Sequence, residues 1–316
     1  MDSPSSSQGV KTRFLIISDT HGMSMQAEYL QHEHIDIAIH CGDLTTESKL
    51  SEYRSAIQLL RQIPAPLKLI IAGNHDFTLD DVSYSKKITE AESRGIDINL
   101  IHKEFGDHGE ARELIEEAKD SGILFLDEGN YHFELSNGAA LRVYASPYTP
   151  SLGDWGFQYR QGEDHAFSMD MDVDSVDVVI THGPPRGIMD YTDSGQRAGC
   201  PHLFEAVARC RPRMHCFGHI HEAWGAKLVT WQKTVSERPS HFTDIDNGKS
   251  EVLAKLSTLS QGDETLFCCA TSHCSKDTTP VQRGLQTLFV NAAIEGTEDR
   301  PIQLPWLVDL DLPYLA

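Results

Sequence analysis

One stretch near the start of the chain indicates the fold class: Phe14-Leu15-Ile16-Ile17-Ser18-Asp19-Thr20-His21. In it a short apolar run ends in a carboxylate and an imidazole. Four further apolar runs end in the same way along the chain. They lead into His40-Cys41-Gly42-Asp43, Gly73-Asn74-His75-Asp76, Thr181-His182-Gly183-Pro184-Pro185 and Gly218-His219-Ile220-His221. Short apolar runs that alternate with amphipathic stretches are typical of buried strands and covering helices. The sequence therefore predicts an α/β domain.

Three stretches between the runs predict helices. Residues 48–62 place Leu50, Tyr53, Ile57 and Leu60 on one face, and residues 198–210 carry a similar stripe. Residues 104–120 are strongly acidic, which indicates a solvated helix. From residue 123 the pattern changes to short apolar segments separated by turns, including Asn137-Gly138, and this pattern predicts a hairpin. We therefore expect two sheets.

The domain organisation is simple. We expect residues 1–10 to form a flexible tail and residues 11–316 to form one domain. Within it, residues 232–284 are rich in Ser, Thr, Asp and Lys and lack clear periodicity, so we expect a surface insertion there.

The chain is acidic, with 27 Lys plus Arg against 47 Asp plus Glu and a net charge of −20. Such a charge disfavours long nucleic acids and anionic membranes as partners. No apolar run approaches the roughly 20 residues of a membrane helix, and the first residues do not resemble a secretory signal. The seven cysteines form no Cys-x-x-Cys pair, which favours a reducing compartment. We expect a cytoplasmic protein; its oligomeric state stays open.

The polar segments after the five runs should meet, because the carboxyl ends of parallel strands share one edge of a sheet. They offer imidazole, carboxylate and carboxamide groups without a thiolate, a set that suits Mn, Fe, Zn or Ni. There are about seven candidate ligands, too many for one tetrahedral ion. Two divalent ions that share a carboxylate fit better, and such pairs serve phosphoryl hydrolysis.

These blocks, taken in order, resemble the calcineurin-like metallophosphoesterases. The matching residues are Asp19-x-His21, Gly42-Asp43, Gly73-Asn74-His75-Asp76, His182-Gly183 and Gly218-His219-x-His221. A finer resemblance, to the metallophosphoesterase-domain-containing proteins, rests on Cys41-Gly42-Asp43-Leu44-Thr45, Thr181-His182-Gly183-Pro184-Pro185, Gly199-Cys200, the stretch from Arg211 to Glu222, and Asn291-Ala292-Ala293. That subgroup is associated with phosphodiesterase activity, including on cyclic nucleotides. The resemblance implies a two-sheet α/β sandwich with helices outside and a dimetal site at the strand ends.

The resemblance also implies the role of each site residue. The first metal would be held by Asp19, His21 and His221, and the second by Asn74, His182 and His219. Asp43 would bridge the ions, a hydroxide between them would attack phosphorus in line, and His75 would act as general acid beside the phosphate, with Asn74 close to it. Some relatives place an Asp three residues after the bridging Asp to orient this His; here Thr46 stands there, so the partner of His75 stays unidentified.

Contacts to the substrate are less determined. Arg186 either reaches a substrate phosphate or is a surface cation. Trp155, Phe157 and Tyr159 either line a substrate pocket or pack a loop. The leading hypothesis is a metal-dependent phosphodiesterase for a small nucleotide. The alternatives are a non-catalytic module that binds nucleotide or metal on the same fold, and a phosphomonoesterase or nuclease.

Overall fold

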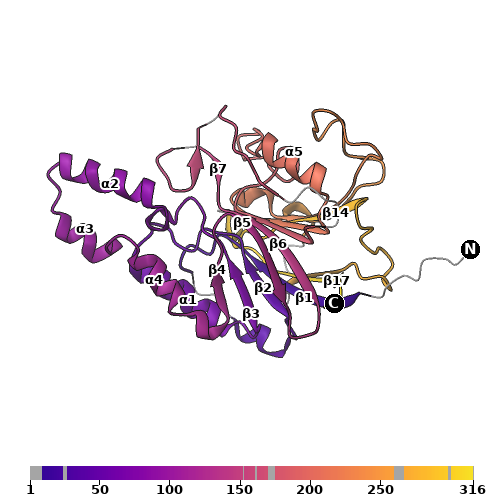
Figure 1. The fold of residues 1–316 in the computed structure, drawn as a ribbon, viewed down its shortest axis with the longest axis horizontal. Helices are drawn as coiled ribbons and strands as arrows, with labels where there is room; N and C mark the ends of the chain where they lie inside the picture. Colours follow the sequence, from indigo (N-terminus) through magenta and orange to yellow (C-terminus); the bar gives the residue numbers. More distant parts are fainter. Residues whose placement is uncertain are drawn as a thin grey trace, which may run out of the picture.

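The computed structural model describes residues 9–23, 27–151, 153–160, 162–169, 175–259, 267–297 and 300–315. Two sheets pack face to face, and helices cover their outer faces (Figure 1). The α/β sandwich expected from the sequence is therefore confirmed. The tail predicted for residues 1–10 lies almost wholly outside the described residues.

The first sheet is built around the stretch that opens the domain. Its strands, in spatial order, are β13 (Cys269–Ser272), β17 (Trp306–Leu312), β1 (Val10–Ile17), β2 (Ile37–His40), β3 (Leu67–Ile70) and β4 (Ile123–Phe125). β1 to β4 are parallel, and β17 runs antiparallel to β1. Their short apolar runs are buried on both faces, as parallel strands require.

The second sheet repeats this plan. Its strands are β12 (Glu251–Lys255), β11 (Gly225–Thr230), β14 (Gln286–Asn291), β10 (Met214–Phe217), β9 (Val178–Thr181), β6 (Ala140–Ser146) and β5 (Gly129–Glu134). β14, β10, β9 and β6 are parallel, and β5 and β6 form the predicted hairpin. Two small ribbons pair β7 (Thr149–Pro150) with β8 (Gln158–Tyr159), and β15 (Glu295–Thr297) with β16 (Arg300–Ile302).

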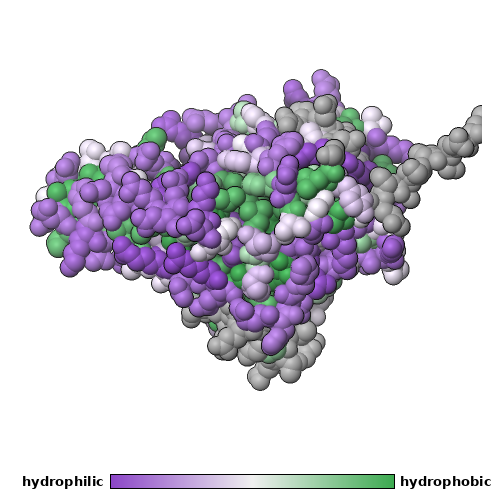
Figure 2. Space-filling view, turned by 60° about the horizontal axis from the view of Figure 1, so that its bottom comes forward, coloured by the Kyte–Doolittle hydropathy of each residue, from purple (hydrophilic) through white to green (hydrophobic). Residues whose placement is uncertain are grey.

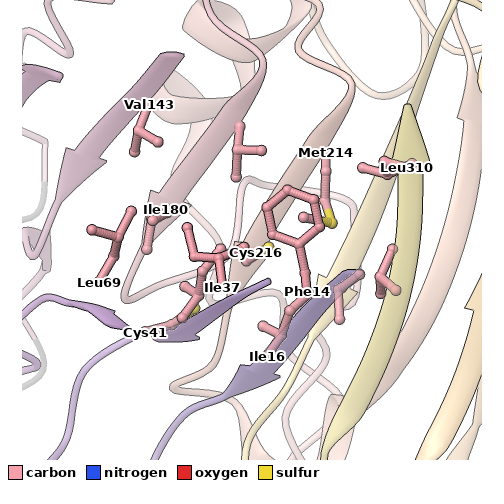
Figure 3. Close-up of a cluster of buried hydrophobic side chains, with 14 of the residues drawn as sticks. Phe14, Ile16, Ile37, Cys41, Leu69, Val143, Ile180, Met214, Cys216 and Leu310 are labelled. Atoms are coloured by element: carbon pink, nitrogen blue, oxygen red, sulfur yellow. The ribbon is translucent and has the colours of Figure 1, made fainter. Parts of the chain in front are cut away.

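The side chains of strand β1 contribute to two hydrophobic cores, one on each face of the first sheet. Phe14 and Ile16 face the second sheet, whereas Leu15 and Ile17 face the helices. Figure 3 shows the inner layer, in which Phe14 and Ile37 of the first sheet lie among side chains of the second, such as Met214. Alternate side chains of one strand point to opposite faces, so each core is filled from the same short run.

The helices cover both outer faces. They are α1 (Leu50–Gln62), α2 (Asp81–Ser93), α3 (Ile98–Phe105), α4 (Glu110–Glu116) and α5 (Pro201–Cys210), with 3-10 turns at Ala27–His32, Phe77–Leu79, Lys119–Ser121, His221–Ala223 and Leu256–Thr258. α1 and α4 pack on the first sheet and α5 on the second, while α2 and α3 project to one side (Figure 1). Within the described part of the chain, no helix is long and apolar enough to cross a membrane.

The single acidic helix predicted for residues 104–120 is wrong. α3 ends at Phe105 and α4 begins at Glu110, because Gly106 and Gly109 adopt φ angles of 81° and 86° between them. A left-handed conformation at these positions breaks a right-handed helix. The helices predicted near residues 48–62 and 198–210 are confirmed as α1 and α5.

The described parts of residues 232–284, predicted to be a surface insertion, contribute a strand to each sheet. β12 pairs with β11 at the edge of the second sheet, and β13 pairs with β17 at the edge of the first. Both strands lie at edges, where a sequence without strong alternation is tolerated because only one side of the strand must be paired.

Candidate metal centre

Loops from both sheets meet at the carboxyl ends of their parallel strands. They follow β1, β2 and β3 in the first sheet and β9 and β10 in the second. Two groups of possible metal ligands result, and within each group the ligand atoms lie within 4.8 Å of one another. These groups, which we call the first and second cluster, are Asp19, His21 and His221, and Asp43, His182 and His219. The convergence expected from the sequence is observed.

Asp43 belongs to the second cluster and also faces the first. Its Oδ2 is 3.3 Å from Nε2 of His182 in the second cluster and 3.8 Å from Nε2 of His21 in the first. Its other oxygen, Oδ1, accepts a hydrogen bond of 2.8 Å from the main-chain N–H of His75. One carboxylate oxygen therefore faces both clusters while the other is held by the backbone, which is the geometry that a bridging ligand needs.

The spacing of the donor atoms fits divalent ions. Two ligand atoms around an ion at about 2.1 Å are roughly 3.0 Å apart in an octahedron and about 3.4 Å apart in a tetrahedron. Oδ1 of Asn74 lies 2.9 Å from Nε2 of His182, and Oδ1 of Asp19 lies 3.3 Å from Nε2 of His221. Asn74 therefore joins the second cluster, as the resemblance implies.

Main-chain carbonyls orient two of the imidazoles. Nδ1 of His21 lies 2.9 Å from the carbonyl of Thr45, and Nδ1 of His182 lies 2.9 Å from the carbonyl of Cys41. When Nδ1–H donates to a carbonyl, Nε2 of the neutral ring carries the lone pair and can bind a metal. Both rings therefore present the nitrogen that faces the clusters.

The backbone of the ligand loops is strained. Asp19, His21, Asp43 and His219 have φ angles of 52°, 44°, 53° and 68°, a left-handed region that residues with a Cβ rarely adopt. Such outliers persist where the surrounding structure enforces them, and they gather at functional sites. The close packing also requires glycine at position 73, because a Cβ there would lie 2.2 Å from Oδ1 of Asp43.

Buried charges of opposite sign dominate the electrostatics of the clusters. Burial disfavours the charged form of Asp43, but the neighbouring His182 outweighs it and lowers the pKa of Asp43 to about 2. Burial likewise opposes charge on His182, yet Asp43 and Asp19 raise its pKa to about 9. Burial and His182 lower the pKa of His219 to about 3. A metal ion must displace the proton of His182, so we expect metal affinity to fall as the pH decreases.

His75 lies beside the clusters with its ring fixed. Its Nδ1 donates a hydrogen bond of 2.6 Å to the carbonyl oxygen of Thr46, and its ring centroid is 4.9 Å from that of His21. The partner that the sequence left unidentified is therefore the main chain of Thr46, at the very position where some relatives carry an Asp. Sequence patterns cannot show this contact because a carbonyl is present at every residue.

The loop around Trp155 reaches the same place. The Trp155 ring lies 4.0 Å from the His75 ring at an angle of 31°, and the residue is 37% exposed. The loop is anchored by hydrogen bonds from Gly156 N to the Asn74 carbonyl and from Phe157 N to Asp80 Oδ2, of 2.9 and 2.8 Å. Phe157 is buried in the loop, whereas Trp155 is partly exposed and its ring packs against His75.

Arg186 lies elsewhere. It is exposed and lines a hollow with Tyr159, Arg197 and His202 at the start of α5. The hydroxyl of Tyr159 donates to Sγ of Cys200 at 2.8 Å. A contact between Arg186 and a substrate phosphate stays a prediction.

Asp76 lies within the site, although the sequence analysis assigns it no role. Its buried carboxylate accepts hydrogen bonds from the main-chain N–H groups of Gly73, Leu44 and Thr45, at 2.8, 3.1 and 3.0 Å, and from the Thr45 hydroxyl at 2.7 Å. Burial and the nearby Asp43 raise its pKa to about 7. Asp76 thus ties the loop that carries Asp43 to the loop that carries Asn74.

Asp76→Ala should lower the free energy of unfolding by about 3 kcal/mol or more, because each of three buried N–H groups left unpaired costs about 1–3 kcal/mol. Urea unfolding measures this loss. Asp76→Asn, which keeps one acceptor oxygen, should lose less than Asp76→Ala. Equal stability of Asp76→Ala and the wild type would show that the loops do not depend on this carboxylate.

The structure is thus an α/β fold with two adjacent groups of candidate metal ligands. The chain belongs to the calcineurin-like phosphoesterase family, whose sequence profile matches residues 12–223. It is 31% identical over 216 residues to human "Metallophosphoesterase domain-containing protein 1", covering 68% of this chain and 62% of that protein. It is 28% identical over 230 residues to "UPF0046 protein T07D4.2" of Caenorhabditis elegans, covering 71% and 55%. The chain thus matches less than two thirds of the length of these relatives.

Solved structures give a weaker likeness. Purple acid phosphatase PPD1 from yellow lupin superposes with a TM-score of 0.42 and 13% identity, over 90% of this chain and 44% of that one. The family assignment rests on the sequence matches.

Proposed function

We propose that this protein hydrolyses phosphodiesters of small nucleotides, including cyclic nucleotides. Membership of the calcineurin-like phosphoesterase family supports hydrolysis of phosphate esters in general. The observation that carries the proposal is the pair of ligand clusters that share Asp43, with His75 held beside them. Two divalent ions bound there would neutralise phosphate oxygens and lower the pKa of a water that attacks phosphorus.

The protein's own groups orient the reaction. Asn74 and Asp43 are fixed on loops that Asp76 ties together, so the substrate phosphate meets a preorganised set of side chains. Nδ1–H of His75 is engaged by the Thr46 carbonyl, which leaves Nε2 to face the substrate. In this reaction the bond from water oxygen to phosphorus forms as the bond to the leaving oxygen breaks. A proton on Nε2 of His75 passes to that leaving oxygen.

A nucleotide is favoured by the aromatic face beside His75. Trp155 is partly exposed and anchored through its loop to α2 and to the Asn74 carbonyl. A base that stacks on such a ring gains about 1–3 kcal/mol. In this proposal the base of a small nucleotide stacks on Trp155 while its phosphate lies at the clusters.

The surface supports a small substrate. The chain carries a net charge of −20, and hydrophilic side chains dominate the face seen in Figure 2, with hydrophobic ones gathered near its centre. A strongly acidic protein repels long polyanions, whereas a single phosphate can be neutralised locally by two divalent ions.

A substrate panel tests the proposal. Metal-free protein is loaded with Mn²⁺, Fe²⁺, Zn²⁺ or Ni²⁺ and offered monoesters, linear diesters and cyclic nucleotides. We expect kcat/KM to be highest for a nucleotide diester. A preference for monoesters would identify a phosphatase of the same family, and nucleotide binding without turnover under every metal would identify a non-catalytic module; either result contradicts the proposal.

Trp155→Ala should raise KM for a nucleotide diester about tenfold and leave kcat nearly unchanged, because it removes one stacking interaction of about 1–3 kcal/mol. Trp155→Phe should restore most of the affinity. A diester without an aromatic ring, such as glycerophosphoethanolamine, serves as the control and should keep its KM. If both substrates lose equally, or if kcat falls, Trp155 acts by supporting His75 rather than by binding a base.

A further inference from the structure

Glu295 is a carboxylate at the first cluster that neither the ligand pattern of the sequence nor the family resemblance assigns. It lies four residues after the end of β14, which runs parallel to β10 in the second sheet. The carboxyl end of β14 therefore adds a sixth strand end to the five that supply ligands. Oε2 of Glu295 lies 3.1 Å from Nε2 of His21.

The main chain holds Glu295 in this position. Its N–H donates a hydrogen bond of 3.0 Å to the carbonyl of Asp19, and the N–H of Ile294 donates one of 2.8 Å to the carbonyl of Ser18. The N–H of Gln303 in turn donates to the Ile294 carbonyl at 2.8 Å. The segment that carries Glu295 is therefore paired along the segment that carries Asp19, a ligand of the first cluster.

The contact with His21 is not a hydrogen bond. Within the described part of the chain, Nε2 of His21 is buried and makes no hydrogen bond, although Oε2 of Glu295 lies at hydrogen-bond distance. Nδ1–H of His21 donates to the Thr45 carbonyl, so Nε2 presents a lone pair. With the ring neutral, this lone pair and the carboxylate oxygen repel each other at 3.1 Å unless a proton or a metal ion lies between them, and the pair does not have the geometry of a hydrogen bond that a shared proton would make.

The distance itself matches a shared ion. Neighbouring ligand atoms around an ion at about 2.1 Å are roughly 3.0–3.4 Å apart. Oε2 of Glu295 and Nε2 of His21, at 3.1 Å, fall in this range, as do Oδ1 of Asp19 and Nε2 of His221 of the same cluster, at 3.3 Å. The side chain of Glu295 is 45% exposed, so it approaches the cluster from the solvent side.

We propose that Glu295 is a further ligand of the metal ion held by Asp19, His21 and His221. This inference rests on the binuclear site of the proposed function. Together with Asp19 and the shared Asp43, Glu295 would give the first site three carboxylates, and such hard oxygen ligands favour Mn²⁺ there relative to softer ions. The second cluster, whose donors come from Asp43, Asn74, His182 and His219, does not gain this ligand.

Calorimetric titration of Mn²⁺ into the metal-free full chain tests the assignment without using activity. Wild-type protein should bind two ions, and Glu295→Gln should weaken one of them about 10- to 100-fold and leave the other unchanged. Glu295→Asp should recover part of the loss. The matched control is Glu222→Gln, because Glu222 adjoins His221 but its carboxylate accepts a hydrogen bond of 2.7 Å from Asp193 N.

The outcomes separate this inference from the proposed function. If Glu295→Gln binds both ions as tightly as the wild type, or if Glu222→Gln weakens binding as much, Glu295 is not a ligand, while the binuclear site stands. If wild-type protein binds no Mn²⁺ or other divalent ion, the proposed function fails first. Selective loss at one site in Glu295→Gln alone supports the assignment.

Discussion

Replacing Asp43 by Asn is expected to lower kcat/KM for a phosphodiester by about 10³-fold or more. Oδ2 of Asp43 faces both clusters, at 3.3 Å from His182 and 3.8 Å from His21. An amide at this position carries no charge and directs an N–H₂ group toward one of the ions. Divalent ions supply several kcal/mol of transition-state stabilisation, and each 1.36 kcal/mol corresponds to a tenfold change in rate.

Steady-state kinetics with saturating Mn²⁺ measures this loss, and thermal unfolding checks that Asp43→Asn remains folded. Asp81→Asn on the exposed start of α2 is the matched control and should stay within about twofold of the wild type. A folded Asp43→Asn protein that retains full activity would contradict a bridging role for this carboxylate.

His75→Asn should lower kcat by about 10²- to 10⁴-fold for a substrate with a poor alkoxide leaving group, the range typical of a lost general acid. The Thr46 carbonyl holds Nδ1 of the ring, which lies beside His21 of the first cluster, and Nε2 is left for the substrate. The loss should shrink strongly for a p-nitrophenyl ester, because p-nitrophenolate leaves without needing a proton.

The comparison of the two leaving groups separates proton donation from substrate binding. His132→Asn, a substitution of an exposed histidine on β5, should leave both rates unchanged. If His75→Asn loses the same factor on both esters, His75 stabilises charge on the phosphate rather than protonating the leaving group.

The sequence predicted the strands and ligands that repeat a simple pattern. Asp19, Asp43 and His182 each follow an apolar run, and a run buried on both faces can be recognised without its neighbours. The convergence of these residues follows from the parallel arrangement of the strands, which the structure confirms. The candidate residues could therefore be predicted from their places after the strands, and their roles as metal ligands from the resemblance.

Other parts of the site depend on contacts that leave no sequence signal. The Thr46 carbonyl, which orients His75, is a main-chain group. The left-handed backbone at Asp19 is enforced by its surroundings and is unusual for a residue with a side chain. Glu295 is one of 47 acidic residues. Only its position after β14, where Asn291-Ala292-Ala293 follows another apolar run, could have indicated a role at the site.

The helices illustrate the same limit. α1 could be predicted because its buried stripe meets the first sheet, but α2 buries only Tyr84 and Ala91 and carries little periodic signal. The acidic residues 104–120 were predicted to form one helix, but Gly106 and Gly109 adopt positive φ angles and separate α3 from α4. In each case the outcome depends on local backbone or tertiary contacts that composition does not encode.

The most direct test of the binuclear centre is a crystal structure of the Mn²⁺-loaded protein with anomalous scattering recorded at the manganese edge. We predict two peaks about 3.5–4 Å apart, with Asp43 touching both. One peak should lie at the first cluster and the other between Asn74 and the second cluster. A single peak, or peaks that do not contact Asp43, would contradict a metal pair at this site.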